Sequence, residues 1–140
     1  MDSHNDKCVM VIDESLPLGI IANTAAVLGI TLGKQHSEIV GADVLDETHN
    51  KHLGITAFPV PILKGNVQII KELRSRLYTE EFRQLTVVDF SDVAQSCNDY
   101  EDFTKKIGQT EEDKLQYFGI AMCGNKKLVN KLTGSMGLLR

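Results

Sequence analysis

A run of apolar residues near the N-terminus constrains the fold more than any other feature of the sequence. Five apolar residues, Cys8–Ile12, lie between Lys7 and Asp13. A continuous apolar run of this length, rich in β-branched residues, is typical of a central strand that is covered on both faces. The sequence therefore predicts that the rest of the chain packs on both sides of this strand.

The segment after this strand, Leu16–Gly33, predicts a helix that is apolar on most of its circumference. Ser15 and Pro17 are typical of a helix start, because serine accepts hydrogen bonds from free backbone N–H groups and proline needs no N–H in the first turn. No charged residue lies between Glu14 and Lys34. We expect such a helix to be buried on more than one side, under its own chain or in a subunit interface.

Neither a membrane span nor a signal peptide fits this helix. Its apolar window of about 18 residues is at the short end of the ~20 needed to cross a bilayer, and it contains one proline and three glycines. The residues before it include Asp2, Asp6 and Lys7, unlike the positively charged start of a signal peptide. We expect a protein without a membrane segment.

Length and composition fit one ordinary globular domain. The chain has 140 residues, 42% of them hydrophobic and 24% charged, enough for a single core. The net charge of −4 argues against a nonspecific nucleic-acid binder. Cys8, Cys97 and Cys123 are an odd number without close spacing, typical of reduced thiols in a cytoplasmic protein. We expect a single domain over residues 7–140 after a disordered tail at 1–6.

Later apolar segments predict three more strands and two more helices. Residues 34–50 predict a loop with one brief strand, and residues 91–109 predict short helices anchored by Tyr100 and Phe103. The predicted regular elements are a second strand within Leu53–Gly65, a helix from Asn66 to Tyr78, a third strand at Leu85–Phe90, a fourth at Leu115–Cys123 and a helix at Asn125–Leu132. This order predicts an α/β fold, a three-layer α/β/α sandwich with a mixed sheet of about four strands.

One cluster of residues offers metal-binding chemistry. His49 and His52 lie with two carboxylates in the segment Asp46–His52, and imidazole and carboxylate groups are competent ligands for zinc or another divalent metal. The spacing is not diagnostic, and a solvated loop is the simpler interpretation. We expect no cofactor.

A second group of polar residues follows the predicted strands. Asp13 comes directly after the first strand, and Asp92 and Ser96 follow the third. In α/β sheets, ligands gather beyond the carboxyl ends of strands, where a carboxylate and a hydroxyl could position water or bind a polar ligand. Helix capping by Asp92 or Ser96 is the alternative. Asn23 is the one amide on the apolar helix, so it finds a partner or faces a site.

Three segments of the chain resemble the peptidyl-tRNA hydrolase II superfamily. They are KCVMVIDESLPLGIIANTAAVLG, similar to its first strand and Ala-rich helix; LTVVDFSDVAQS, similar to its strand before an Asp-x-x-x-Thr turn; and FGIAMCGNKKLVNKLTGSMGLL, similar to its closing strand, helix and Thr-Gly tail. The resemblance implies that family's fold and a homodimer, and it places Asp92 and Ser96 at the active-site turn. A closer likeness is to an uncharacterised domain-of-unknown-function family usually grouped with that fold.

The chain departs from the hydrolases at the groups that carry their chemistry. The hydrolases have lysines near the start of the first helix, where this chain has the apolar residues Gly19–Ala22, so the catalytic lysine has no counterpart. Ser96 replaces a threonine, and the glutamine and histidine further along the helix are absent. Losing cationic groups weakens phosphate binding, which supplies most nucleic-acid affinity.

We therefore expect a non-hydrolytic cytoplasmic protein that binds a small polar ligand near Asp13, Asn23, Asp92 and Ser96. One alternative is a peptidyl-tRNA or related ester hydrolase in which Asp92 orients a water molecule. The other is a ligand-free regulatory or scaffold dimer. A compact uncharged pocket beside Asn23 would favour the ligand binder. An electropositive cleft would favour the hydrolase, and a closed cleft beside a large apolar face would favour the scaffold.

Overall fold

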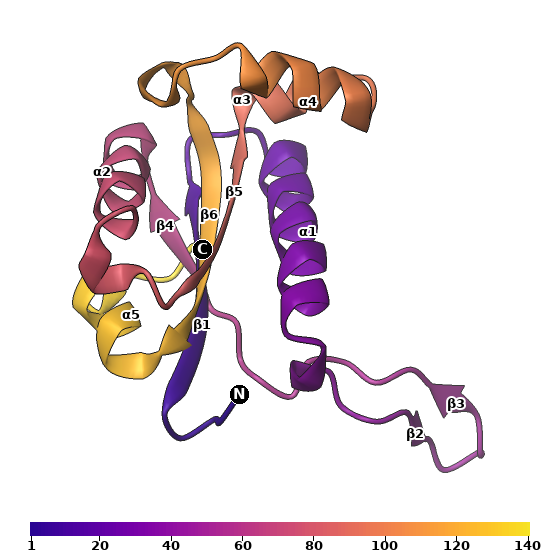
Figure 1. Cartoon of the computed structure of the whole chain (residues 1–140). Coiled ribbons are helices and arrows are strands. Elements are labelled where there is room, and N and C mark those ends of the chain that lie inside the picture. The colour runs from indigo at the N-terminus through magenta and orange to yellow at the C-terminus, as the bar shows by residue number, and fades with distance from the viewer.

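The predicted α/β class is confirmed in a computed structural model that describes every residue from Met1 to Arg140 (Figure 1). Four strands form one mixed sheet in the order β4-β1-β6-β5. Strand β1 (Asp6–Asp13) runs parallel to β4 (Ile62–Gly65) and antiparallel to β6 (Tyr117–Asn125), which in turn pairs antiparallel with β5 (Thr86–Ser91). The predicted central strand is thus confirmed, and it begins at Asp6, one residue before the predicted domain boundary.

Helices pack on either side of this sheet. Helix α1 (Leu18–Gln35) lies on one face, where Leu28 and Leu32 pack with apolar residues of β1, β5 and β6. Helices α2 (Val67–Leu77) and α5 (Lys126–Thr133) cover the other face with the larger apolar cluster. None of the helices has both the length and the apolarity needed to cross a membrane.

Close contact between α1 and the sheet depends on Gly119 of β6. A Cβ atom at this position would lie 2.6 Å from Thr24 Cγ2 and 3.2 Å from Ile12 Cγ1, closer than packed carbon atoms approach. Thr24 is fully buried, and its hydroxyl donates to Ile20 C=O at 2.7 Å. A glycine on the strand and a threonine satisfied by its own helix therefore set the distance between these two elements.

One expectation for α1 is wrong. Ser15 does not cap the helix; Pro17 is the N-cap residue, and the Ser15 backbone N–H and hydroxyl both donate to Asp13 Oδ1. Within the single chain the helix is buried along one side, and Leu18 is 82% exposed and Ile30 is 76% exposed. No other part of the single chain packs on the opposite face of this apolar helix. Burial of a second side in a subunit interface stays a prediction.

One edge of the sheet is covered by other residues of the chain, and the other edge is open. The C-terminal residues run beside β4, where Lys64 N–H donates to Gly137 C=O and Leu139 N–H donates to Ile62 C=O, both at 2.9 Å. Strand β5 forms the other edge and has no strand beside it. Only this second edge leaves backbone groups available for binding.

Residues 40–57 form an arm that projects from the body of the molecule (Figure 1). It follows the single-turn helix η1 (Ser37–Ile39), and its two short strands, β2 (Val44–Leu45) and β3 (Lys51–His52), pair antiparallel. A loop with one brief strand was predicted here. The structure has a hairpin because the two sides of the loop bond to each other.

The segment between β5 and β6 forms a cap over one end of the sheet. It contains α3 (Asp92–Gln95), α4 (Tyr100–Gly108) and the single-turn helix η3 (Glu112–Lys114), so the predicted short helices are confirmed. A further turn, η2 (Glu80–Phe82), connects α2 to β5. Tyr100 is 79% exposed, so its predicted role as a core anchor is wrong.

The expectation of reduced thiols is wrong for two of the three cysteines. Cys8 and Cys123 lie opposite each other on β1 and β6 and form a disulfide, while Cys97 is free. Their Cα atoms are 4.1 Å apart, near the roughly 4.5 Å of antiparallel pairs that exchange no backbone hydrogen bonds. Because the cytoplasmic location was inferred partly from free thiols, the compartment stays a prediction.

The disulfide predicts one free thiol in the unreduced chain. When the protein is unfolded in denaturant without reductant, thiol titration is expected to detect Cys97 alone. After reduction, the same assay detects all three cysteines. Three reactive thiols before reduction would contradict the pairing of Cys8 with Cys123, and Cys97→Ser is the control that abolishes the unreduced signal.

Candidate functional site

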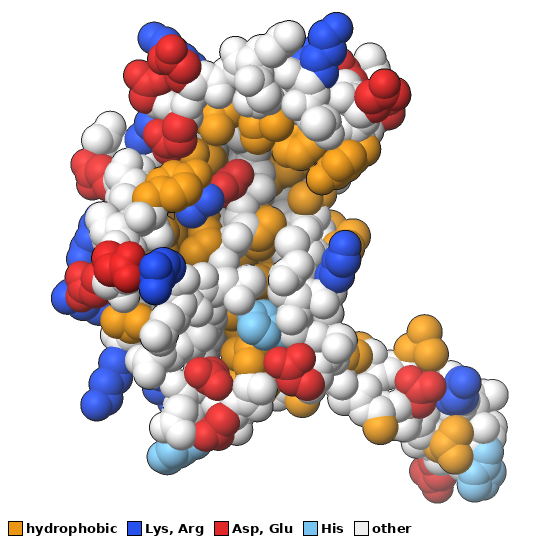
Figure 2. Space-filling model, in the orientation of Figure 1, with side chains coloured by type: hydrophobic (Ala, Val, Ile, Leu, Met, Phe, Trp, Pro, Cys, Tyr) orange, Lys and Arg blue, Asp and Glu red, His pale blue; other side chains and the backbone are white.

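A large cavity lies along the open edge of β5, in a cleft between α1 and the α3–α4 cap. Its volume is about 560 Å³, and eight of its 12 lining residues are hydrophobic. Figure 2 shows this hollow below the cap, with apolar side chains on its walls. The lining residues are Val27, Thr31, Val87, Val88, Asp89, Phe90, Ala94, Cys97, Asn98, Asp99, Tyr100 and Phe103.

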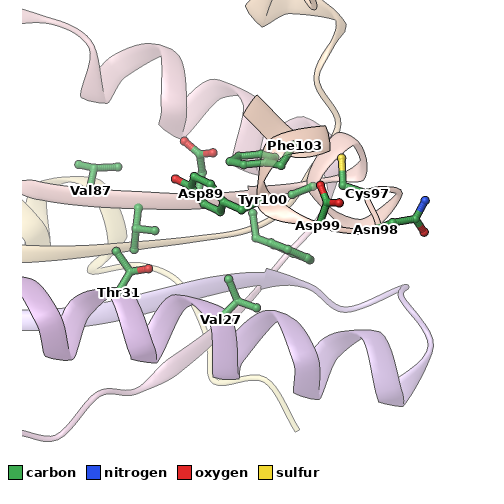
Figure 3. A pocket seen from close by; sticks show the side chains of 12 residues that line it. Val27, Thr31, Val87, Asp89, Cys97, Asn98, Asp99, Tyr100 and Phe103 are labelled. Atoms are coloured by element: carbon green, nitrogen blue, oxygen red, sulfur yellow. The ribbon is translucent and has the colours of Figure 1, made fainter. Parts of the chain in front are cut away.

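Three elements supply the walls of the cleft. Val27 and Thr31 project from α1 toward the β5 edge, and Phe103 reaches toward the same strand from α4 (Figure 3). The rings of Tyr100 and Phe103 pack edge to face with their centres 5.5 Å apart. Asp99 holds the start of α4 by accepting from Asp102 N–H at 2.7 Å. The aromatic wall is therefore fixed by a capped helix.

The backbone hydrogen bonds show which peptide groups of β5 face the cleft. Met10 N–H donates to Pro61 C=O at 3.0 Å, and Glu14 N–H donates to Gly65 C=O at 3.1 Å. The even-numbered residues of β1 thus direct their peptide groups toward β4. Such a residue of β1 forms no backbone hydrogen bonds with the residue opposite it on β6. In an antiparallel ladder, that opposite residue directs its own N–H and C=O groups away from β1, toward its other neighbouring strand.

Ala121 of β6 pairs with Met10, so its peptide groups point toward its other partner, Val88 of β5. The alternate residues on β5, Val87 and Asp89, therefore direct their N–H and C=O groups out of the sheet. The close Cα spacing of the disulfide pair, two residues away in the same register, agrees with this pattern. The cleft thus has unpaired backbone donors and acceptors between apolar walls.

Asp89 adds a largely buried carboxylate to this edge. Arg74 Nε of α2 lies 3.0 Å from Asp89 Oδ2, although its N–H is not aligned for a hydrogen bond. The Arg74 guanidinium carbon lies 3.9 Å from the centre of the Tyr78 ring. Burial raises the pKa of Asp89 above its usual value by more than the Arg74 charge lowers it. A proton at this position is therefore held more tightly in the folded chain.

Two of the predicted site residues serve in turns and helix contacts. Asp13 is 1% exposed, and its carboxylate accepts from the Ser15 backbone and hydroxyl at 2.9 and 2.7 Å. Asn23 is exposed on α1, and its amide donates to Gln95 Oε1 of α3 at 3.3 Å. Neither residue lines the cleft, so their predicted part in ligand binding stays a prediction.

Asp92 is the first residue of α3 and Ser96 is its C-cap residue, and both lie next to the cleft but outside its lining. Asp92 Oδ1 accepts from Val93 N–H at 2.9 Å and from Gln116 N–H at 3.1 Å, which connects α3 to the start of β6. The Ser96 hydroxyl donates to Val93 C=O at 2.8 Å. Ser91, rather than Asp92 or Ser96, is the N-cap residue. Their predicted catalytic roles stay predictions.

The two histidines proposed as metal ligands lie on the arm. His52 Nε2 is 2.8 Å from Asp46 Oδ2, and this hydrogen bond is the main cause that lowers the pKa of Asp46. His49 is in the turn with a positive φ of 67°. Nowhere does the structure gather three His, Cys, Asp or Glu side chains that could hold a metal ion.

The cleft lies beside the third strand, as the sequence indicated, but its aromatic and helical walls were missed. The sequence predicts Phe103 only as an anchor of short helices, and it places Val27 and Thr31 on the apolar helix without assigning either to a site. The available signal was the clustering of Tyr100 and Phe103 in an otherwise polar segment. Their position over the β5 edge depends on how the cap folds back, which the local sequence does not specify.

Comparison with known proteins assigns the chain to a family. Residues 6–140 match the family described as protein of unknown function, DUF2000. The chain belongs to the DUF2000 family. No curated protein matches the sequence. This agrees with the expected likeness to a domain-of-unknown-function family, whereas no match links the chain to the peptidyl-tRNA hydrolases.

A solved structure shares the fold of this DUF2000 chain. It is a protein of unknown function, Atu0240, from Agrobacterium tumefaciens strain C58. The two chains superpose with a TM-score of 0.86 at 17% sequence identity, over 96% of this chain and 97% of the other. At this identity the likeness establishes a common fold.

The raised pKa of Asp89 predicts the direction of a pH effect on stability. A carboxyl group with a raised folded-state pKa contributes stability that is present below its unfolded pKa and is lost as pH rises through the folded value. Relative to Asp89→Asn, wild-type protein is therefore expected to gain free energy of unfolding as the pH falls from about 7 to about 3. Urea unfolding at several pH values measures this difference.

Asp46→Asn is the matched control, because the pKa of Asp46 is lowered. The free energy of unfolding that wild-type protein has in excess of Asp46→Asn is expected to decrease as the pH falls, opposite to the trend for Asp89. A difference in free energy of unfolding between wild-type protein and Asp89→Asn that also decreased at low pH would contradict the prediction. It would mean that attraction to Arg74 lowers the pKa of Asp89 by more than burial raises it.

Proposed function

We propose that this DUF2000 chain is a non-hydrolytic protein that binds a small ligand with amide-like polar groups in the cleft along β5. The observation that carries the proposal is the pair of outward-facing peptide groups at Val87 and Asp89 between apolar walls. Backbone donors and acceptors at an open sheet edge bind groups of the same kind. A ligand there would complete hydrogen bonds that the chain leaves open.

The size and lining of the cleft support a compact, partly apolar ligand. Small-molecule sites typically measure roughly 300–1,000 Å³ and have apolar walls with a few placed polar groups, and the 560 Å³ of this cleft lies in that range. Thr31, Asp89, Asn98 and Asp99 supply the polar side chains. The ligand is thus polar along the strand and apolar where it meets Val27 and the aromatic wall.

The charge of the cleft supports a non-hydrolytic role. Its lining includes two aspartates but no lysine or arginine, and a site without cationic groups binds phosphate poorly. The apolar residues Gly19–Ala22 stand where the hydrolases have their lysines. Transfer RNA is therefore a poor match for this surface.

The proposal extends to the finer expectations from sequence. It includes a three-layer arrangement of the peptidyl-tRNA hydrolase II type, supported by the three similar segments and by helices on either side of the sheet. It also includes a cytoplasmic location and a homodimer. The open cleft disfavours the ligand-free scaffold, for which a closed cleft was expected.

The hydrolase is the second candidate function. It is favoured by the resemblance of Asp92 and Ser96 to the Asp-x-x-x-Thr turn of the peptidyl-tRNA hydrolase II superfamily, and by their place next to the cleft. Asp92 Oδ1 accepts from two backbone N–H groups, so Asp92 Oδ2 is the oxygen that would orient a water molecule. A ligand titration and a turnover assay with purified protein distinguish the two functions.

Small amides are the first probes of the cleft. We expect N-acetyl-leucine methylamide or its phenylalanine analogue to shift the ¹⁵N–¹H signals of Val87 and Asp89 in an NMR titration. Filling the cleft by Thr31→Phe is expected to weaken binding at least about tenfold, or about 1.4 kcal/mol. Thr104→Phe, on the exposed side of α4, is the control that keeps binding. Unchanged β5 signals with both probes would count against the proposal.

Turnover of peptidyl-tRNA is expected to be absent. The assay compares wild-type protein, Asp92→Ala and an active member of the hydrolase family as the positive control. The missing lysine and the acidic cleft are the physical reasons for this expectation. Hydrolysis by the wild-type chain that Asp92→Ala abolishes would replace the binding proposal with the hydrolase.

A further inference from the structure

The arm and the outer face of α1 are two uncovered apolar surfaces on the same chain. Every residue from Val40 to Leu53 is exposed, and the arm projects into solvent as a separate unit in Figures 1 and 2. Seven of the 11 large hydrophobic residues exposed in the molecule lie on these two surfaces. They are Leu18 and Ile30 on α1, and Val40, Val44, Leu45, Leu53 and Ile55 on the arm.

The arm is ordered by its own backbone rather than by the body. Gly41 N–H donates to Ile55 C=O at 2.9 Å, and Ala57 N–H donates to Ile39 C=O at 2.7 Å. Gly54 N–H donates to Asp43 Oδ1 at 2.9 Å. An isolated two-stranded hairpin is at best marginally stable in water. A projecting hairpin that carries aliphatic side chains is therefore stabilised when another surface covers it.

The outer face of α1 fits an apolar partner of this kind. Its exposed residues from Leu18 to Ile30 carry no charge, and Gly19, Ala22 and Ala26 among them are small enough for another backbone to approach. The first charge on this face is Lys34, at the end of the helix, whereas the arm carries three carboxylates and one lysine. Asp43 and Asp46 pair with Lys51 and His52 inside the arm, which leaves the Glu47 carboxylate as the charge on the arm that complements Lys34.

We propose that residues 40–57 are a dimerisation arm that lies along the outer face of α1 of a second copy of this chain. A two-fold axis makes the contact reciprocal, so each copy both gives an arm and receives one. One interface then covers both apolar surfaces at once. The arm and the exposed part of α1 together supply a surface within the about 20–30 residues a side of a stable interface. The β5 cleft is not part of this contact.

Two substitutions separate this arrangement from any other dimer. Ile55→Lys alters the arm, and Ile30→Glu alters the helix face. Each variant alone loses both reciprocal contacts and is expected to be monomeric, with a dissociation constant raised at least about a thousandfold, from micromolar to millimolar. An equal mixture of the two is expected to recover a dimer. In the mixed dimer one contact is wild-type, and the other pairs the introduced lysine of one copy with the introduced glutamate of the other.

The measurement is molar mass by light scattering during size-exclusion chromatography, with the chain's 15.5 kDa as reference. Wild-type protein is expected at twice that mass, and so is Val67→Glu, which charges an exposed valine on α2. Circular dichroism and thermal unfolding confirm that the variants fold. A monomeric wild-type chain at about 100 μM, where a micromolar dimer is associated, would overturn the proposal. So would variants that remain dimeric alone, or a mixture that fails to recover.

Discussion

The pairing of β1 with β6 is the contact on which the rest of the structure depends. It joins the beginning of the chain to its end, in a ladder that runs from Asp6 opposite Asn125 to Ile12 opposite Gly119. Every other strand of the main sheet attaches to one member of this pair, and both helical layers pack on its residues. The disulfide between Cys8 and Cys123 lies inside this ladder. The apolar runs that form the two strands are therefore the main determinants of the fold.

The same ladder determines where the chain can bind. It gives the sheet one edge that the C-terminal residues cover and one that nothing covers. Its hydrogen-bond alternation decides that Val87 and Asp89, rather than their neighbours, present free peptide groups at the open edge. The α3–α4 cap and α1 then enclose this edge with apolar side chains. The candidate site thus follows from strand register as much as from particular side chains.

The uncovered apolar surfaces support the proposal that a second copy of the chain covers them. A helix without charge over most of its length is buried on one side only, and a hairpin with aliphatic side chains has no surface beneath it. Burying a large aliphatic side chain stabilises a structure by roughly 1.5–3 kcal/mol. The cleft on β5 and the proposed dimer contact on α1 use separate surfaces, so binding and association can be tested independently.

Local pattern determined the four strands and the main helices, because apolar runs and 3–4 spacing report burial directly. The polar site that the sequence predicts near the end of β5 stays a prediction, because none of its four residues lines the cleft. The sequence could not show that Cys8 meets Cys123, that Tyr100 and Phe103 wall a cleft, or that residues 40–57 fold into an arm. Each of these depends on residues distant in the chain coming together, and such contacts are decided by strand register and by the direction in which a loop returns. The local residues of those segments fit more than one such arrangement.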